Sequence, residues 1–229
     1  MSPRPAVVLV HGAWHGSWCW QRVVPQLERL GLAVRVLDLP SVGGGAHENL
    51  SSDAAAVRAV LDRLDAPALL CGHSYGGMVI SLAASGRADV AHLVYLCAFM
   101  PEEGQSLIAI GGGRNAPWIR QFDDGTALPD LDRAGDLFYA DCDPDTRSWA
   151  VGQLRRQRAA AYAEPVPRPA WREIDSTYIL CAQDRAMPPE LQRNVFAPRA
   201  RAVRELQTSH SPFLSQPAAL AELLASLAT

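Results

Sequence analysis

The chain has 229 residues, of which 48% are hydrophobic and 20% charged, a composition typical of a globular domain with a sizeable core. Its formal net charge of −3 gives no electrostatic reason to bind nucleic acid or an anionic membrane. All 21 basic residues are arginine, which excludes Schiff-base chemistry and P-loop phosphate binding because both need a lysine.

The cysteines and the N-terminal segment indicate a cytoplasmic protein. The five cysteines are odd in number, widely spaced and free of any Cys-x-x-Cys pair, so they predict neither a disulfide framework nor a zinc site. Reduced thiols fit the cytosol best. The first apolar run, residues 6–10, is too short for a signal peptide or a membrane span.

Apolar runs and helical patterns alternate along the chain. The predicted strands occupy residues 6–10, 33–37, 66–71, 90–99, 177–182 and 201–206. The predicted helices run from Ser17 to Gly31, over 52–64, from about Met78 to Gly86, and over 217–227. Unbroken branched-aliphatic strands separated by helices predict an α/β fold with a doubly wound, mostly parallel sheet.

A Gly-x-Ser-x-Gly turn centred on Ser74 joins the strand at 66–71 to the helix that follows it. This pattern carries chemistry only between a strand and a helix, because a sharp turn must lift the serine hydroxyl above the sheet edge. Gly72 and Gly76 leave no β-carbon to block the close approach of helix and strand. The alternative is a glycine-rich turn whose serine only caps a helix.

The order of acid and histidine along the chain favours a catalytic role for Ser74. Asp184 follows the strand at 177–182, and His210 is the only histidine downstream of it, so the order is Ser74, Asp184, His210. Asp38 precedes Ser74 and is interpreted as structural. His92 lies near the start of its strand, at the wrong end of the sheet for catalysis.

A His-Gly turn follows the first strand, where a backbone N–H group can face the serine. We assign this donor, one half of an oxyanion hole, to Ala13. The rings of His11 and His15 are expected to brace the loop through hydrogen bonds rather than to transfer protons. Trp14 is expected either to pack or to face the substrate.

At Met100-Pro101 the alternation stops, and irregular sequence continues until the core resumes. We expect an α/β core of residues 1–100 and 173–229 with an inserted cap of residues 101–172. The cap aromatics are expected to divide between an apolar pocket and the cap's own core. The run from Asp141 to Asp145 lacks the glycine and the glutamate of a calcium loop, so we predict a turn with a helix N-cap and no metal.

With these motifs in place, the chain resembles the α/β-hydrolase superfamily throughout its core. Residues 11–20 and 209–214 are similar to the group that contains plant methyl-ester esterases, hydroxynitrile lyases and related bacterial esterases. The resemblance implies a serine esterase that forms an acyl-enzyme and needs no cofactor or metal. Ser74 would attack, His210 would act as base and Asp184 would orient it, with the N–H groups of Ala13 and Tyr75 forming the oxyanion hole.

Other functions remain open at this point. A same-fold lyase, a polyketide-tailoring thioesterase or cyclase, and a non-enzymatic small-molecule receptor share the scaffold. The lyases carry a threonine where Gly12 stands and a lysine where Ser211 stands, which favours hydrolysis here. The expected partner is a small-molecule ester, with no nucleic acid and no membrane, and either a monomer or a homodimer. The residues expected to line the substrate pocket are Gly12, Trp14, Trp118, Phe138, Tyr139 and Trp149.

Overall fold

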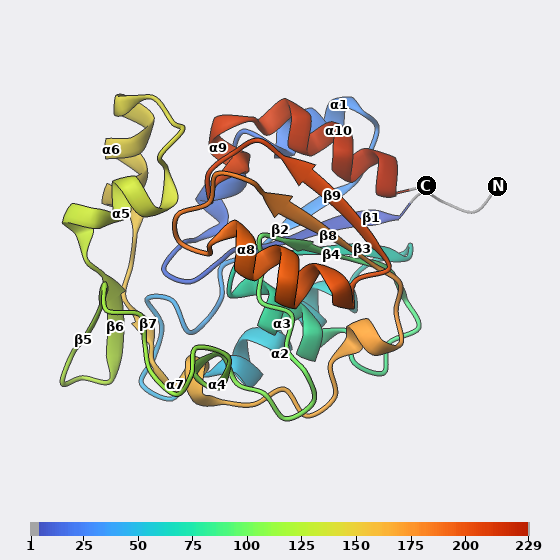
Figure 1. The fold of residues 1–229 in the computed structure, drawn as a ribbon. Coiled ribbons are helices and arrows are strands. Elements are labelled where there is room, and N and C mark those ends of the chain that lie inside the picture. Colours follow the sequence, from blue (N-terminus) through green and yellow to red (C-terminus); the bar gives the residue numbers. More distant parts are fainter. Residues whose placement is uncertain (1–4, 229) are drawn as a thin grey trace.

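The structure, a computed structural model, describes residues 5–228, and its centre is a sheet of six parallel strands (Figure 1). The spatial order is β2-β1-β3-β4-β8-β9. The strands are β1 (Ala6–Val10), β2 (Val34–Val36), β3 (Ala68–His73), β4 (Val90–Leu96), β8 (Ser176–Cys181) and β9 (Ala202–Leu206). Strands β1, β3 and β8 are buried along their whole length, as unbroken apolar runs predict for a sheet covered on both faces. The predicted fold class is confirmed.

Helices cover both faces of this sheet (Figure 1). One face carries α1 (Val24–Arg29) and α10 (Pro217–Leu227), and the other carries α2 (Leu50–Leu61) and α3 (Gly76–Ala83). Two short helices, α8 (Pro189–Leu191) and α9 (Pro212–Ser215), lie in the loops that follow β8 and β9. The helix α2 begins with a capping box in which the Asn49 side chain accepts the N–H of Ser52 at 3.0 Å.

The predicted single helix from Ser17 to Gly31 is wrong. The structure has a 3₁₀ turn at Ser17–Trp20 and a separate helix α1 that begins at Val24. Pro25 lies in the first turn of α1, where its missing N–H costs nothing, whereas in the interior of a longer helix it would remove a hydrogen bond.

The segment between β4 and β8 forms a smaller unit beyond the carboxyl ends of the strands (Figure 1). It has a three-stranded antiparallel sheet of β5 (Ile119–Gln121), β6 (Thr126–Pro129) and β7 (Gln157–Arg158). Its helices are α4 (Leu107–Ile110), α5 (Leu131–Phe138), α6 (Pro144–Gln153) and α7 (Ala160–Ala163). We call this unit the cap and propose residues 101–172 as its limits.

The cap is tied to the core by backbone hydrogen bonds at β7. The N–H of Arg158 donates to the carbonyl of Ser41 at 2.9 Å, and the N–H of Gly43 donates to the carbonyl of Arg156 at 2.8 Å. The loop that follows β2 therefore extends the cap sheet. Within residues 5–228, no helix is long and apolar enough to cross a membrane.

Candidate active site

Ser74 occupies a strained turn between β3 and α3. Its φ of +52° lies in the left-handed region, which non-glycine residues seldom adopt outside functional turns. A β-carbon on Gly72 would lie 2.5 Å from the carbonyl oxygen of Gly76, and one on Gly76 would lie 2.8 Å from the carbonyl oxygen of His11. The two glycines are therefore needed for the strand and helix to meet this closely.

Asp184 and His210 form a buried pair at the carboxyl edge of the sheet. His210 Nδ1 donates to Asp184 Oδ2 at 2.6 Å. The other oxygen, Oδ1, accepts the backbone N–H groups of Ala186 and Met187, both at 2.8 Å. An ionised carboxylate is acceptor-only, so these donors fit the charged form and fix the proton of His210 on Nδ1. The free Nε2 of His210 is thereby left as a proton acceptor.

Gln192 is a partner of this pair that the sequence did not reveal. Its Nε2 donates to Asp184 Oδ2 at 3.0 Å and to the carbonyl oxygen of Met187 at 2.7 Å, and its Oε1 accepts the N–H of Cys181 at 3.1 Å. The side chain is fully buried. Gln192 thus holds the carboxylate in place, but no motif in the sequence marks it.

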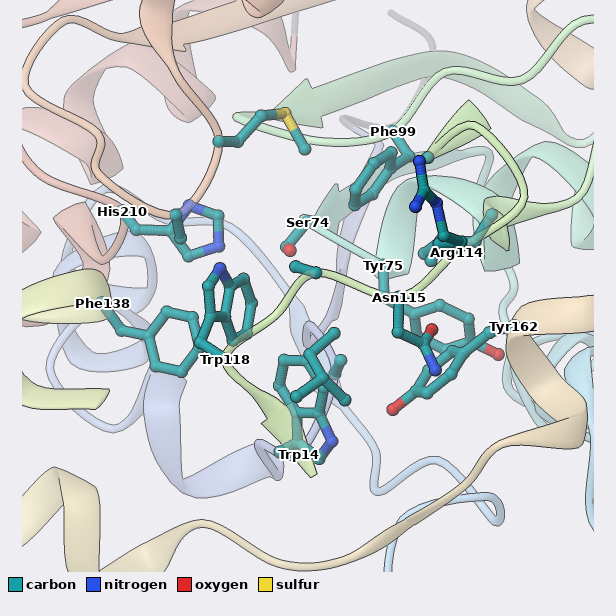
Figure 2. A pocket seen from close by; sticks show the side chains of 17 residues that line it. Trp14, Ser74, Tyr75, Phe99, Arg114, Asn115, Trp118, Phe138, Tyr162 and His210 are labelled. Atoms are coloured by element: carbon teal, nitrogen blue, oxygen red, sulfur yellow. The ribbon is translucent and has the colours of Figure 1, made fainter. Parts of the chain in front are cut away.

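Ser74 and His210 face the same cavity, and the imidazole points toward the serine hydroxyl (Figure 2). Among the described residues, no hydrogen bond joins Ser74 Oγ to His210. Such contacts are often long in an unliganded site and tighten when substrate binds.

His73 lies beneath His210 and supports its backbone. The two ring centroids are 4.6 Å apart, and His73 Nε2 donates to the carbonyl oxygen of His210 at 2.9 Å. Burial holds the pKa of His73 well below its ordinary value, so the ring is neutral at pH 7.

A β-carbon on Gly12 would lie 2.7 Å from His73 Nδ1. Gly12 is not among the residues that line the cavity, so its prediction as a pocket residue is corrected. The absence of a β-carbon at Gly12 instead leaves room for the His73 ring.

A metal ion has one conceivable place among the described residues. Ligand atoms of His73, Cys97 and His210 lie within 4.8 Å of one another. Burial raises the pKa of the Cys97 thiol well above its ordinary value, so the thiol keeps its proton. A metal ion here would have to displace that proton, and His210 is already held by Asp184 through Nδ1.

The backbone N–H groups of Ala13 and Tyr75, two residues that line the cavity beside Ser74, have no hydrogen-bond partner within the described chain. The loop that carries Ala13 is braced as predicted. His15 Nδ1 donates to the carbonyl oxygen of Ala13 at 2.7 Å, and His11 Nδ1 donates to that of Gly12 at 2.8 Å. Burial lowers the pKa of His11 to about 4 and that of His15 to about 3, so both rings are neutral.

The cavity over Ser74 has a volume of about 140 Å³ and mostly apolar walls. Trp14, Trp118 and Phe138 line it, as predicted (Figure 2). The sequence did not single out several further lining residues, among them Phe99, Leu107, Arg114, Asn115 and Met187.

Tyr139 and Trp149 do not line this cavity, and both predictions are corrected. Tyr139 is fully buried behind the wall, and its hydroxyl donates to His15 Nε2 at 2.8 Å. The helix α5 ends at Phe138, so neighbouring residues point to different sides of the chain. Trp149 is 37% exposed and packs edge-on against Trp18, at 5.2 Å between ring centroids.

Comparison with known proteins gives the family. The chain matches the α/β hydrolase family over residues 7–223 and belongs to it. An α/β hydrolase of Aspergillus novofumigatus is 30% identical over 231 residues, which cover 93% of this chain and 92% of that protein. A carbendazim hydrolyzing esterase of a Nocardioides species is 36% identical over 176 residues, covering 69% and 72%. A crystal structure of a pyrethroid hydrolase is similar with a TM-score of 0.84 at 28% identity, covering 98% of this chain and 97% of that chain.

Proposed function

We propose that the protein is a serine hydrolase that cleaves a small carboxylic ester through an acyl-enzyme. The observation that carries this proposal is the meeting of Ser74, on its strained turn, with the His210–Asp184 pair at one apolar cavity. The esterase similar to this chain, named for carbendazim, supports an ester as substrate.

The residues suit a two-step acyl transfer. Ser74 Oγ attacks the ester carbonyl carbon while its proton passes to His210 Nε2, and the tetrahedral intermediate expels the alcohol, which takes the proton. Water then attacks the acyl-enzyme with His210 again as base, which releases the acid and restores Ser74. The N–H groups of Ala13 and Tyr75 are the proposed donors to the oxyanion.

The cavity indicates which esters fit. A volume of about 140 Å³ with aromatic walls favours short or flat apolar groups.

We place the enzyme in the cytoplasm, because all five of its cysteines are free thiols.

Turnover of p-nitrophenyl esters of increasing acyl length tests the proposal. We expect wild-type protein to hydrolyse the acetate and butyrate esters over many turnovers and Ser74→Ala to lose at least about a thousandfold in kcat. A same-fold lyase would instead release cyanide from mandelonitrile in a Ser74-dependent manner and leave these esters untouched. That result would replace the esterase proposal.

A further inference from the structure

A buried hydrogen-bond network runs from the cap to the loop that carries Ala13. Its centre is Gln157 on β7, which is fully buried. Gln157 Oε1 accepts the backbone N–H of Trp14 at 3.1 Å and the hydroxyl of Tyr162 at 2.9 Å. Its Nε2 donates to Ser41 Oγ at 2.9 Å. A backbone N–H can only donate, so the orientation of the Gln157 amide is fixed.

The network continues from Ser41 to the other side of the cavity. Ser41 Oγ donates to Asp53 Oδ2 at 2.6 Å, and the Tyr75 hydroxyl donates to the same oxygen at 2.7 Å. The Ser41 N–H donates to Asp53 Oδ1 at 2.8 Å. Asp53 is fully buried on α2, and these three donors are the ones that hold its carboxylate.

Both ends of the network lie beside a proposed oxyanion donor. Trp14 directly follows Ala13, and Tyr75 carries the second free N–H on its own backbone. Trp14 has a φ of +63°, a conformation that a tryptophan holds only when its surroundings fix it. The hydrogen bond from its N–H to Gln157 and that from Arg155 N–H to its carbonyl, at 2.9 Å, supply this restraint from the cap.

We propose that Gln157 is a positioning residue for the oxyanion hole. It holds the Ala13–Trp14 arm from the cap and, through Ser41 and Asp53, couples it to the Tyr75 arm. The proposal rests on the proposed ester hydrolysis, because an oxyanion hole has a role only where a carbonyl oxygen gains charge. In this account the cap does more than enclose substrate, since one of its side chains sets the geometry of the catalytic donors.

The test compares two ketones of nearly the same shape. With 2,2,2-trifluoroacetophenone, Ser74 Oγ adds to the carbonyl carbon, its proton passes to His210, and the carbonyl oxygen becomes an oxyanion. Acetophenone occupies the cavity without adding. The ratio of their inhibition constants, measured against p-nitrophenyl acetate hydrolysis, therefore reports on the oxyanion hole rather than on the cavity walls.

The decisive variant is Gln157→Met, which keeps the length of the side chain and removes its polar atoms. We expect inhibition by trifluoroacetophenone to weaken at least about tenfold and kcat to fall by a similar factor. Inhibition by acetophenone and KM should stay within about twofold. The control is Gln105→Met, which removes a cap glutamine whose Oε1 accepts the Glu102 N–H at 2.9 Å, outside the network. It should leave the ratio unchanged.

A second variant, Ser41→Ala, removes the hydroxyl that accepts from Gln157 Nε2 and donates to Asp53, so it breaks the link between the two arms and leaves Gln157 itself unchanged. We expect inhibition by trifluoroacetophenone to weaken at least about threefold while inhibition by acetophenone stays within about twofold, and this result decides the matter if Gln157→Met does not fold. Equal weakening of both ketones in Gln157→Met would show that Gln157 only shapes the cavity. An unchanged ratio in Gln157→Met, or in Ser41→Ala, would equally overturn the positioning role.

The two proposals fail in distinguishable ways. Wild-type protein that hydrolyses no ester and adds to no ketone would remove the proposed function and this inference together. Active wild-type protein with an unaltered Gln157→Met ratio would remove this inference alone.

Discussion

His210 Nδ1 and Asp184 Oδ2 are joined by a 2.6 Å hydrogen bond, and both side chains are buried. In Asp184→Asn, the N–H groups of Ala186 and Met187 would hold the amide oxygen at the Oδ1 position. The amide NH₂ would then face His210 and Gln192, which are both donors. The imidazole must take the wrong tautomer or turn away.

We therefore expect Asp184→Asn to lower kcat by about a thousandfold, with KM changed little. Steady-state kinetics with p-nitrophenyl acetate measures both. The loss should be smaller than that in His210→Ala, which removes the base itself. A fall of less than tenfold in Asp184→Asn would mean that this carboxylate does not orient the base.

The contact between Gly12 and His73 predicts a loss of stability in Gly12→Ala. The new β-carbon would meet His73 Nδ1 at 2.7 Å and Ser74 Cβ at 3.0 Å, so the ring or the turn must shift. We expect the free energy of unfolding to fall by about 1–3 kcal/mol, measured by urea denaturation. The control is Gly152→Ala in α6, where a β-carbon has no neighbour within 4 Å, and it should raise stability by about 0.5–1 kcal/mol. Equal effects of the two changes would refute the contact.

Trp118 and Trp149 should differ in their effect on substrate choice. Trp118 lines the cavity and packs against Trp14, with ring centroids 5.8 Å apart, whereas Trp149 lies outside. Trp118→Ala enlarges the cavity, so we expect the ratio of kcat/KM for the octanoate ester to that for the acetate ester to rise at least about tenfold. Trp149→Ala should leave the ratio within twofold. A shift caused by Trp149→Ala instead would place the acyl site elsewhere.

Asp53 predicts an unusual dependence of stability on pH. Burial raises its pKa from 3.8 to about 6, against the hydrogen bonds from Ser41 and Tyr75. The unfolded chain therefore loses this proton first, and stability falls as pH rises from about 4 through 6. As the pH rises from 5 to 7.5, the titration of Asp53 should lower the free energy of unfolding by about 1 kcal/mol.

Urea denaturation of wild type and Asp53→Asn at both pH values isolates that effect, because other titrating groups cancel. The free energy of unfolding of wild type relative to the variant should drop by about 1 kcal/mol from pH 5 to pH 7.5. A change of opposite sign would mean that the Asp53 carboxylate is stabilised by folding.

Much of the core follows from local pattern. Apolar runs predicted all six strands to within three residues at each end, and the largest difference is at β4, which ends at Leu96 rather than at residue 99. The order of Ser74, Asp184 and His210 was readable because chain order and strand ends place the three together in this architecture.

The roles of the cap aromatics and of the buried polar residues that support the site could not be predicted from sequence in the same way. Trp118 and Trp149 look alike in sequence, and only tertiary packing decides which one meets the cavity. Gln192 and Gln157 are single buried amides whose hydrogen-bond partners lie on segments distant in the chain. No motif or residue spacing in the sequence therefore identifies them. A buried hydrogen-bond network is a property of the fold rather than of any motif.

The most direct test of Ser74 as the nucleophile is to identify the serine that a fluorophosphonate probe modifies. The probe phosphonylates a serine that is activated by a base, with loss of fluoride. Intact mass and peptide mapping should show one label per chain, on Ser74. The label should be abolished in Ser74→Ala and retained in Ser85→Ala, which changes a serine just beyond the C-terminal end of α3. Labelling that persists in Ser74→Ala, or that maps to another serine of the wild-type chain, would contradict the assignment of Ser74 as the nucleophile.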